Sequence, residues 1–157
     1  MYKIVVFSDS HGSYDEMEMV IKKEKPDLVF FLGDGERDID LIQSIYDDLK
    51  VMAVRGNCDL YSDLPAFLDF SIHGVRIFAT HGHSYEVKYD RTLHVLKKEG
   101  KKYGADVILF GHTHEPYYEK YNGVIIMNPG TIGEGSRLSY GILNVDNGHV
   151  SGKILPL

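Results

Sequence analysis

The stretch "KIVVFSDSHG", from Lys3 to Gly12, decides how this chain begins to fold. Its first half is an apolar, mostly β-branched run, Ile4 to Phe7, which predicts a short strand buried on both faces. Its second half turns polar at once, with an aspartate, a serine, a histidine and a glycine in succession. Several later strands are expected to end in the same abrupt way.

The first 55 residues alternate between predicted strands and helices. In the segment Tyr14–Lys25, acidic residues come early and lysines come late, which is the order that suits a helix dipole. A second helix, Ile39–Leu49, is expected between the strands Asp27–Leu32 and Val51–Val54. This βαβαβ order predicts a parallel sheet with right-handed crossovers.

The second half of the chain is richer in strands and turns. Phe67–Ile72 and Val75–Thr80 flank His73-Gly74, a hairpin signal, and Asn-Gly pairs mark two more hairpins. The further expected elements are a helix, a strand and those two hairpins: Tyr89–Gly104, Asp106–Phe110, Tyr117–Asn128 and Tyr140–Leu155. We therefore expect one α/β domain over residues 1–157, with two stacked mixed β-sheets flanked by helices.

Composition narrows the functional classes. The net charge of −6 and the absence of a basic run argue against general nucleic-acid binding. A small phosphorylated substrate remains open, because a bound cation reverses the local field. The single cysteine, Cys58, excludes an intrachain disulfide and fits a reducing cytoplasm. No apolar run approaches the roughly 18 residues of a membrane span, so no membrane association is expected.

Five predicted strands end in Asp, Asn or His, usually beside a glycine. Ligands bind at the carboxyl ends of strands in parallel α/β sheets, and glycine lets the backbone turn sharply there. The candidate ligands at these ends are Asp9, His11, Asp34, Asn57, His81, His112 and His114.

Carboxylate, amide and imidazole groups form a mixed ligand set that suits divalent metals. Seven such groups are too many for one ion, so we expect two ions that share a carboxylate, roughly 3.5–4 Å apart as in many phosphatases. Taken singly, Asp34 and Asn57 could be turn residues and His81 a loop residue. Their joint occurrence at strand ends favours the metal interpretation.

The ordered series Asp-x-His, Gly-Asp, Gly-Asn-x-Asp, His-Gly-His and Gly-His-Thr-His resembles the calcineurin-like metallophosphoesterase superfamily. It looks most like the small bacterial and archaeal phosphodiesterase branch, and it extends from Asp9 to about Arg137. The resemblance implies metal-dependent hydrolysis of a small-molecule phosphodiester. A phosphomonoesterase, or a non-catalytic protein-binding scaffold of the same fold, is the alternative.

The resemblance also implies a role for each candidate. Asp34 would bridge two ions, with a metal-bridging hydroxide as nucleophile, because a bound dication lowers the pKa of water toward neutrality. Asn57, Cys58 and His81 would take part in catalysis. The ions would be Mn²⁺ by resemblance, with Ni²⁺, Fe, Co²⁺ or Zn²⁺ as alternatives. The remaining ligands divide by resemblance into Asp9, His11 and His114 for the first ion and Asn57, His81 and His112 for the second.

Cys58 departs from the broad family pattern, in which a histidine follows the asparagine. A thiol with a pKa of about 8.5 is a poor substitute for an imidazolium. We therefore expect a preference for esters whose alcohol leaves easily. The alternative is a packed small residue with no catalytic part. A purely structural zinc site is disfavoured, because such sites are rich in cysteine.

Three further residues are weaker candidates for substrate or supporting contacts. Asp59 could accept a hydrogen bond from His11 or another ligand, or be a solvated loop acid. His83 could touch substrate or be a surface histidine. Arg137, at the end of the glycine-rich segment Asn128–Arg137, could bind a phosphate oxygen or belong to a structural turn.

The remaining features concern partners and pocket shape. The tyrosines of the hairpin Tyr117–Asn128, namely Tyr117, Tyr118 and Tyr121, predict either a homodimer or higher homo-oligomer interface or ordinary sheet packing. The loops Leu60–Ala66 and Ser84–Asp90 are expected to shape the substrate pocket. Three histidines are expected to be structural or exposed: His73, His94 and His149.

Overall fold

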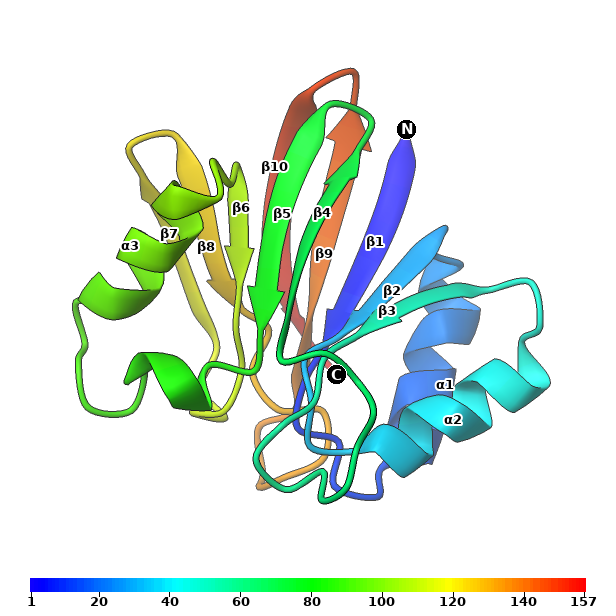
Figure 1. Cartoon of the computed structure of the whole chain (residues 1–157). Helices are drawn as coiled ribbons and strands as arrows, with labels where there is room; N and C mark the ends of the chain where they lie inside the picture. The colour runs from blue at the N-terminus through cyan, green and yellow to red at the C-terminus, as the bar shows by residue number, and fades with distance from the viewer.

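Two five-stranded sheets stack against each other in the computed structural model, which describes all residues 1–157 (Figure 1). The first sheet has the order β10-β9-β1-β2-β3, with β1, β2 and β3 parallel and β9 antiparallel to both β1 and β10. Its strands are β1 (Tyr2–Phe7), β2 (Leu28–Phe31), β3 (Lys50–Ala53), β9 (Ser139–Asp146) and β10 (His149–Pro156).

The second sheet has the order β4-β5-β6-β8-β7. Its three central strands, β5, β6 and β8, are parallel, while β4 and β7 pair antiparallel at the edges. Both sheets are therefore mixed, as the sequence predicted. The strands are β4 (Phe67–Ile72), β5 (Val75–Thr80), β6 (Val107–Leu109), β7 (Tyr117–Tyr121) and β8 (Val124–Asn128).

Helices cover the outer faces of the two sheets (Figure 1). The helices α1 (Tyr14–Glu24) and α2 (Glu36–Ile45) pack on the first sheet, and α3 (His94–Lys102) packs on the second. A short 3₁₀ helix, His83–Tyr85, follows β5. This arrangement confirms the expected αββα fold class. No helix is long and apolar enough to cross a membrane.

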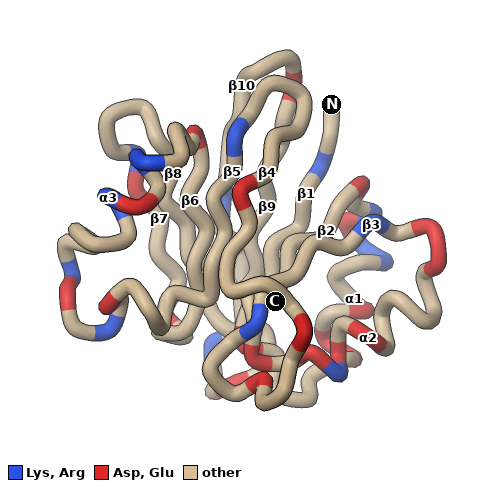
Figure 2. Tube along the Cα trace, in the orientation of Figure 1, with Lys and Arg blue, Asp and Glu red and all other residues tan.

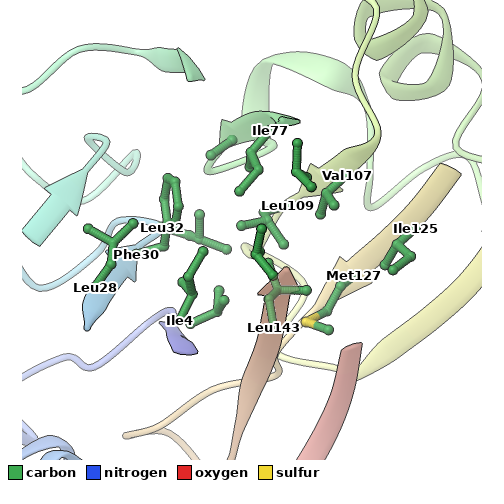
Figure 3. Close-up of a cluster of buried hydrophobic side chains, with 14 residues drawn as sticks. Ile4, Leu28, Phe30, Leu32, Ile77, Val107, Leu109, Ile125, Met127 and Leu143 are labelled. Atoms are coloured by element: carbon green, nitrogen blue, oxygen red, sulfur yellow. The ribbon is translucent and has the colours of Figure 1, made fainter. Parts of the chain in front are cut away.

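Strand β1 shows how the core is divided. Ile4 and Val6 join the cluster of buried side chains between the two sheets (Figure 3), while Val5 and Phe7 pack against α1 and α2. Because successive side chains of a strand point to opposite faces, a run of four apolar residues serves both layers. All four are fully buried. The first strand is thus buried on both faces, as its sequence predicted.

The three predicted hairpin turns all form with the same backbone conformation. Both central residues have positive φ in His73-Gly74, at 46° and 81°, and the two Asn-Gly turns show the same pattern. Positive φ at both positions is typical of the type I′ turn, whose twist suits a two-residue hairpin. The turns therefore fix the register of the antiparallel pairs.

Two helices differ from their predicted bounds. Helix α2 begins at Glu36, three residues before the predicted start, and its first N–H groups donate to the carboxylate of Asp59. Helix α3 begins only at His94, because the Asp90 carboxylate accepts the N–H groups of Thr92 and His94 in a separate turn. In both cases a side-chain acceptor, invisible to periodicity, sets the boundary.

Candidate metal centre

The polar loops after β1, β2, β3, β5 and β6 meet at one edge of the sandwich. The Asp9 N–H donates to Gly33 O at 3.0 Å, and the Gly111 N–H donates to His81 O at 2.9 Å. The first bond joins two loops of the first sheet and the second joins two loops of the second sheet, while the His112 N–H donates to Asp9 Oδ2 at 3.1 Å and so links the two sheets. Figure 2 shows acidic positions gathered at this lower edge, near the start of α2.

Five of the seven candidate ligands have a left-handed backbone. This conformation is uncommon outside glycine and persists only where the surrounding structure holds it, often at functional sites. It turns the chain sharply at the strand ends, so that side chains two residues apart can face the same volume. The φ angles are 56° for Asp9, 43° for His11, 62° for Asp34, 69° for His112 and 64° for His114.

Gly33 allows the loops to approach closely. It has φ +102°, and a Cβ atom there would lie 2.5 Å from Gly56 N and 2.9 Å from His81 Nδ1. Only glycine fits between these two loops. The Gly-Asp and Gly-Asn motifs are thus explained by packing as well as by chemistry.

The first group of candidate ligands surrounds an unpaired carboxylate oxygen. Asp9 is fully buried, and its Oδ1 has no hydrogen-bond partner. His114 Nε2 lies 3.3 Å from this atom and His11 Nε2 lies 3.9 Å away. Burying a carboxylate oxygen without a hydrogen-bond donor costs folding free energy, and a bound cation would remove that cost.

The second group converges on His81 Nε2. Asn57 Oδ1 lies at 3.0 Å, His112 Nδ1 at 3.2 Å and Asp34 Oδ2 at 3.2 Å from this nitrogen. The ring is held from behind, because its Nδ1 lies 2.7 Å from Leu32 O. That contact makes Nδ1 the protonated nitrogen and leaves Nε2 with a lone pair aimed at the group.

Asp34 lies between the two groups. Its Oδ2 is 3.2 Å from His81 Nε2 and 3.9 Å from His11 Nε2. Its Oδ1 accepts the N–H of Cys58 at 2.7 Å. This position is the one that a shared carboxylate would need.

The protonation states of Asp34 and His112 suit metal ligands, whereas a cation would have to displace a proton from His81. Burial alone would lower the pKa of His81, but the hydrogen bond to Asp34 and the charges of Asp9 and Asp34 outweigh it and raise that pKa. Burial and the charge of His81 lower the pKa of His112 to about 4, so this imidazole is neutral at neutral pH. Burial alone would raise the pKa of Asp34, but the hydrogen bond and charge of His81 outweigh it and hold that pKa well below its usual value. Metal ligands must be deprotonated in this way.

The donor set fits two ions. The ligand atoms of Asp9, His11 and His114 all lie within 4.8 Å of one another, and so do those of Asp34, His81 and His112. Ligand atoms bound to one ion at about 2.0–2.2 Å stand roughly 3–4.4 Å apart. The side chains can therefore close on cations with small adjustments.

Asp59 supports this centre, but not through the contact expected from the sequence. Its carboxylate makes no hydrogen bond to His11 or to another ligand side chain. It accepts four backbone N–H groups instead, from Asp34, Gly35, Glu36 and Gly56, at 2.8–3.1 Å. It thereby joins the loop of Asp34 to the loop of Asn57, because side-chain acceptors replace the sheet ladder where the strands end.

Two further supporting residues were missed in the sequence. Asp38 is buried, and its Oδ2 accepts from Ser10 Oγ at 2.5 Å and from the Gly12 N–H at 2.8 Å. Asn128 is buried, and its amide donates to Gly111 O at 3.1 Å in the His112 loop. A signal existed for Asp38, since it lies four residues before Ile42 on the apolar face of α2.

The two remaining weaker candidates, His83 and Arg137, lie in different parts of the molecule. The ring of His83 lies 5.4 Å from that of His81 and 6.0 Å from that of His112, so it borders the centre. Arg137 lies elsewhere, in a hollow that it lines with Pro116 and Leu157. Arg37, which sequence analysis did not single out, lines a hollow together with the predicted ligands His11 and Asp34.

Comparison with known proteins identifies the family. A model of the calcineurin-like phosphoesterase superfamily domain matches residues 2–148. The chain belongs to this superfamily. The probable metallophosphoesterase YsnB of Bacillus subtilis is 30% identical over 151 residues, which cover 92% of this chain and 85% of YsnB. Phosphodiesterase YfcE of Escherichia coli is 29% identical and is aligned over 93% of this chain and 89% of its own.

Comparison with solved structures gives the same fold. A predicted phosphoesterase from Streptococcus pneumoniae superposes with a TM-score of 0.82 at 27% identity, over 99% of this chain and 89% of that one. Vps29 of Entamoeba histolytica, solved in complex with Zn²⁺, has a TM-score of 0.78 at 18% identity and 98% coverage of both chains, a likeness that shows the fold alone. The family and the branch inferred from the motifs are both confirmed.

Proposed function

We propose that this phosphoesterase-family protein is a phosphodiesterase that uses two divalent metal ions, Mn²⁺ foremost, on a small-molecule substrate. The observation that carries the proposal is the buried, unpaired Oδ1 of Asp9 facing the Nε2 atoms of His11 and His114. Its relative YfcE is a phosphodiesterase, which supports the choice of a diester.

The chain's residues would divide between the ions as the geometry groups them. Asp9, His11 and His114 would hold one ion, His81 and His112 with Asn57 the other, and Asp34 would serve both. The ions would lower the pKa of a water molecule and polarise the phosphoryl oxygens. The loops orient their ligands through the fixed contacts of His81 to Leu32 and of Asp59 to four N–H groups.

The surroundings favour a diester over a monoester. The hollow beside the ligands has the acidic side chains of Glu36 and Asp40 on its wall, with Arg37 as its one basic residue. The ions would attract the phosphoryl charge of either ester, but only a diester has a second ester group, which carries no charge of its own and can lie beside this acidic wall without like-charge repulsion.

Cys58 would act as a neutral group. In the metal-free chain, partial burial raises the pKa of its thiol, and the charge of Asp34 raises it further. A thiol is a weak donor, so it gives little help to a departing alkoxide. This fits the expected preference for alcohols that leave easily.

A non-catalytic scaffold is the competing function, because the fold is also that of Vps29. The full set of seven ligands favours catalysis, since a scaffold does not need it. We also propose a cytoplasmic location, from the single free cysteine. Self-association through the exposed Tyr118 and Tyr121 remains a prediction.

The test is hydrolysis of bis(p-nitrophenyl) phosphate and of p-nitrophenyl phosphate, with Mn²⁺ and after chelation. We expect metal-dependent turnover that is faster for the diester. His112→Gln should lose most of it, while His149→Gln, which changes an exposed histidine outside the centre, should retain it. Equal rates with and without metal would exclude the metalloenzyme, and faster monoester turnover would exclude the diester preference.

A further inference from the structure

The loop between β3 and β4 presents two large apolar side chains to solvent beside the metal centre. Leu60 is 77% exposed, and Tyr61 is fully exposed. Leu60 also lines the hollow of about 530 Å³ that contains His11, Asp34 and Cys58. Single exposed apolar residues are ordinary, but two consecutive ones, the first of which lines this hollow, call for an explanation.

The exposure does not come from a loosely held loop. Asp59, directly before Leu60, accepts three backbone N–H groups from the neighbouring segment of residues 34–36 and one from Gly56 of its own loop. At the other end, Arg55 donates from its guanidinium to Leu64 O at 2.9 Å and from its N–H to Pro65 O at 2.9 Å. The loop is therefore fixed on both sides of Leu60 and Tyr61.

The backbone of Tyr61 supports a functional explanation. Its φ of 60° lies in the left-handed region, which a bulky residue rarely adopts. Because the Tyr61 side chain is fully exposed, no packing energy offsets this strain in the free protein. Strain of this kind gathers at ligand clamps and active sites, where a bound partner makes use of it.

The charges of the hollow indicate what kind of group fits there. Asp38 and Asp59 are already engaged by hydrogen bonds, while Glu36 and Asp40 make no ion pair and are opposed on this wall only by the single positive charge of Arg37. A second anionic group on the substrate would be repelled by these carboxylates. An uncharged group would meet Leu60 without that penalty and would remove apolar surface from water.

We propose that Leu60 and Tyr61 form a subsite for an uncharged apolar or aromatic ester group of the phosphodiester. The subsite rests on the proposed phosphodiesterase function and adds the substrate class. The protein prefers diesters with such a group over diesters with small alkyl or anionic groups. Leu60 and Tyr61 determine specificity and take no part in the chemical step.

The test compares bis(p-nitrophenyl) phosphate with methyl p-nitrophenyl phosphate, which share a leaving group. We expect Leu60→Ser and Tyr61→Ser to lower kcat/KM for the diaryl ester roughly five- to tenfold each, mainly through KM. The conservative variant Leu60→Met should keep kcat/KM for the diaryl ester near the wild-type value. Ile45→Ser, which removes a 56% exposed apolar side chain from the far end of α2, should leave it unchanged.

The methyl ester shows which ester group uses the subsite. A fall for both esters assigns the subsite to the leaving group, and a fall for the diaryl ester alone assigns it to the retained group. Both results support the proposal, and unchanged constants for both esters overturn it.

A binding measurement separates this proposal from the proposed function. Calorimetric titration of the metal-loaded protein with diphenyl phosphate and with dimethyl phosphate needs no turnover. Tighter binding of diphenyl phosphate that Leu60→Ser abolishes supports the subsite even in a protein without activity. Equal binding of the two phosphates overturns the subsite even in an active enzyme.

Discussion

Replacing Asp59 with asparagine should weaken both the fold and the metal centre, although Asp59 is not itself a candidate ligand. Its two carboxylate oxygens each accept two N–H groups, Oδ1 from Gly35 and Glu36, and Oδ2 from Asp34 and Gly56. Asparagine keeps one oxygen and places an NH₂ group against the other pair. Two charge-assisted bonds are lost, and two N–H groups face a donor.

Hydrogen bonds to charged groups contribute about 1.5–3 kcal/mol each, and the partly exposed position of Asp59 brings the combined loss to about 2–3 kcal/mol. Urea unfolding of the metal-free protein, followed by circular dichroism, measures this loss. Because the loops of Asp34 and Asn57 are no longer tied together, metal affinity should also fall roughly tenfold or more, as calorimetry would show.

The matched control is Asp63→Asn, a change in the same loop at an exposed carboxylate without a hydrogen bond. This change should alter neither the free energy of unfolding nor the metal affinity. An Asp59→Asn protein as stable as the wild type would refute the reasoning, because the four N–H groups would then be satisfied equally well by water.

Three further results are expected. Gly33→Ala should destabilise the protein by about 2–4 kcal/mol, since its Cβ would lie 2.5 Å from Gly56 N; a urea midpoint like that of the wild type would contradict this. Asp9→Asn should leave the metal-free protein at least as stable as the wild type, because burial raises the pKa of Asp9 and its ionised Oδ1 is unpaired. Added metal should no longer raise the melting temperature of this variant. A loss of metal-free stability would argue against an unpaired charge. Burial and a hydrogen bond to Glu24 raise the pKa of Tyr140 to about 12, above its unfolded value of about 10. The protonated phenol therefore stabilises the fold below about pH 10, and this contribution is lost as the pH rises through 12. Tyr140→Phe should remove one late phase from the alkaline absorbance titration.

Much of this fold was predictable because its signals are local. The apolar run Ile4–Phe7, the three two-residue turns and the charge order of α1 each specify their own element. The candidate ligands were predictable for a related reason, since parallel strands carry their loops to one edge of a sheet. The grouping of Asp9 with His114, more than 100 residues away, came from the family resemblance that the ordered motifs carry.

The remaining features depend on contacts between distant segments. The start of α2 is set by Asp59, which lies in another loop, and no periodicity in Glu36–Ile45 shows it. The support given by Asn128 to the His112 loop depends on a hydrogen bond across two strand ends. Arg37, in the first turn of α2, and Arg137, in a loop, are both exposed cations, and only the folded chain shows that Arg37 borders the hollow.

The central claim is that seven side chains gather around two neighbouring cations. Anomalous diffraction at the manganese edge from crystals of the Mn²⁺-reconstituted protein tests it most directly. We predict two peaks per chain, one among Asp9, His11 and His114, the other among Asn57, His81 and His112, with Asp34 touching both. A single peak, or peaks away from these residues, would contradict the account.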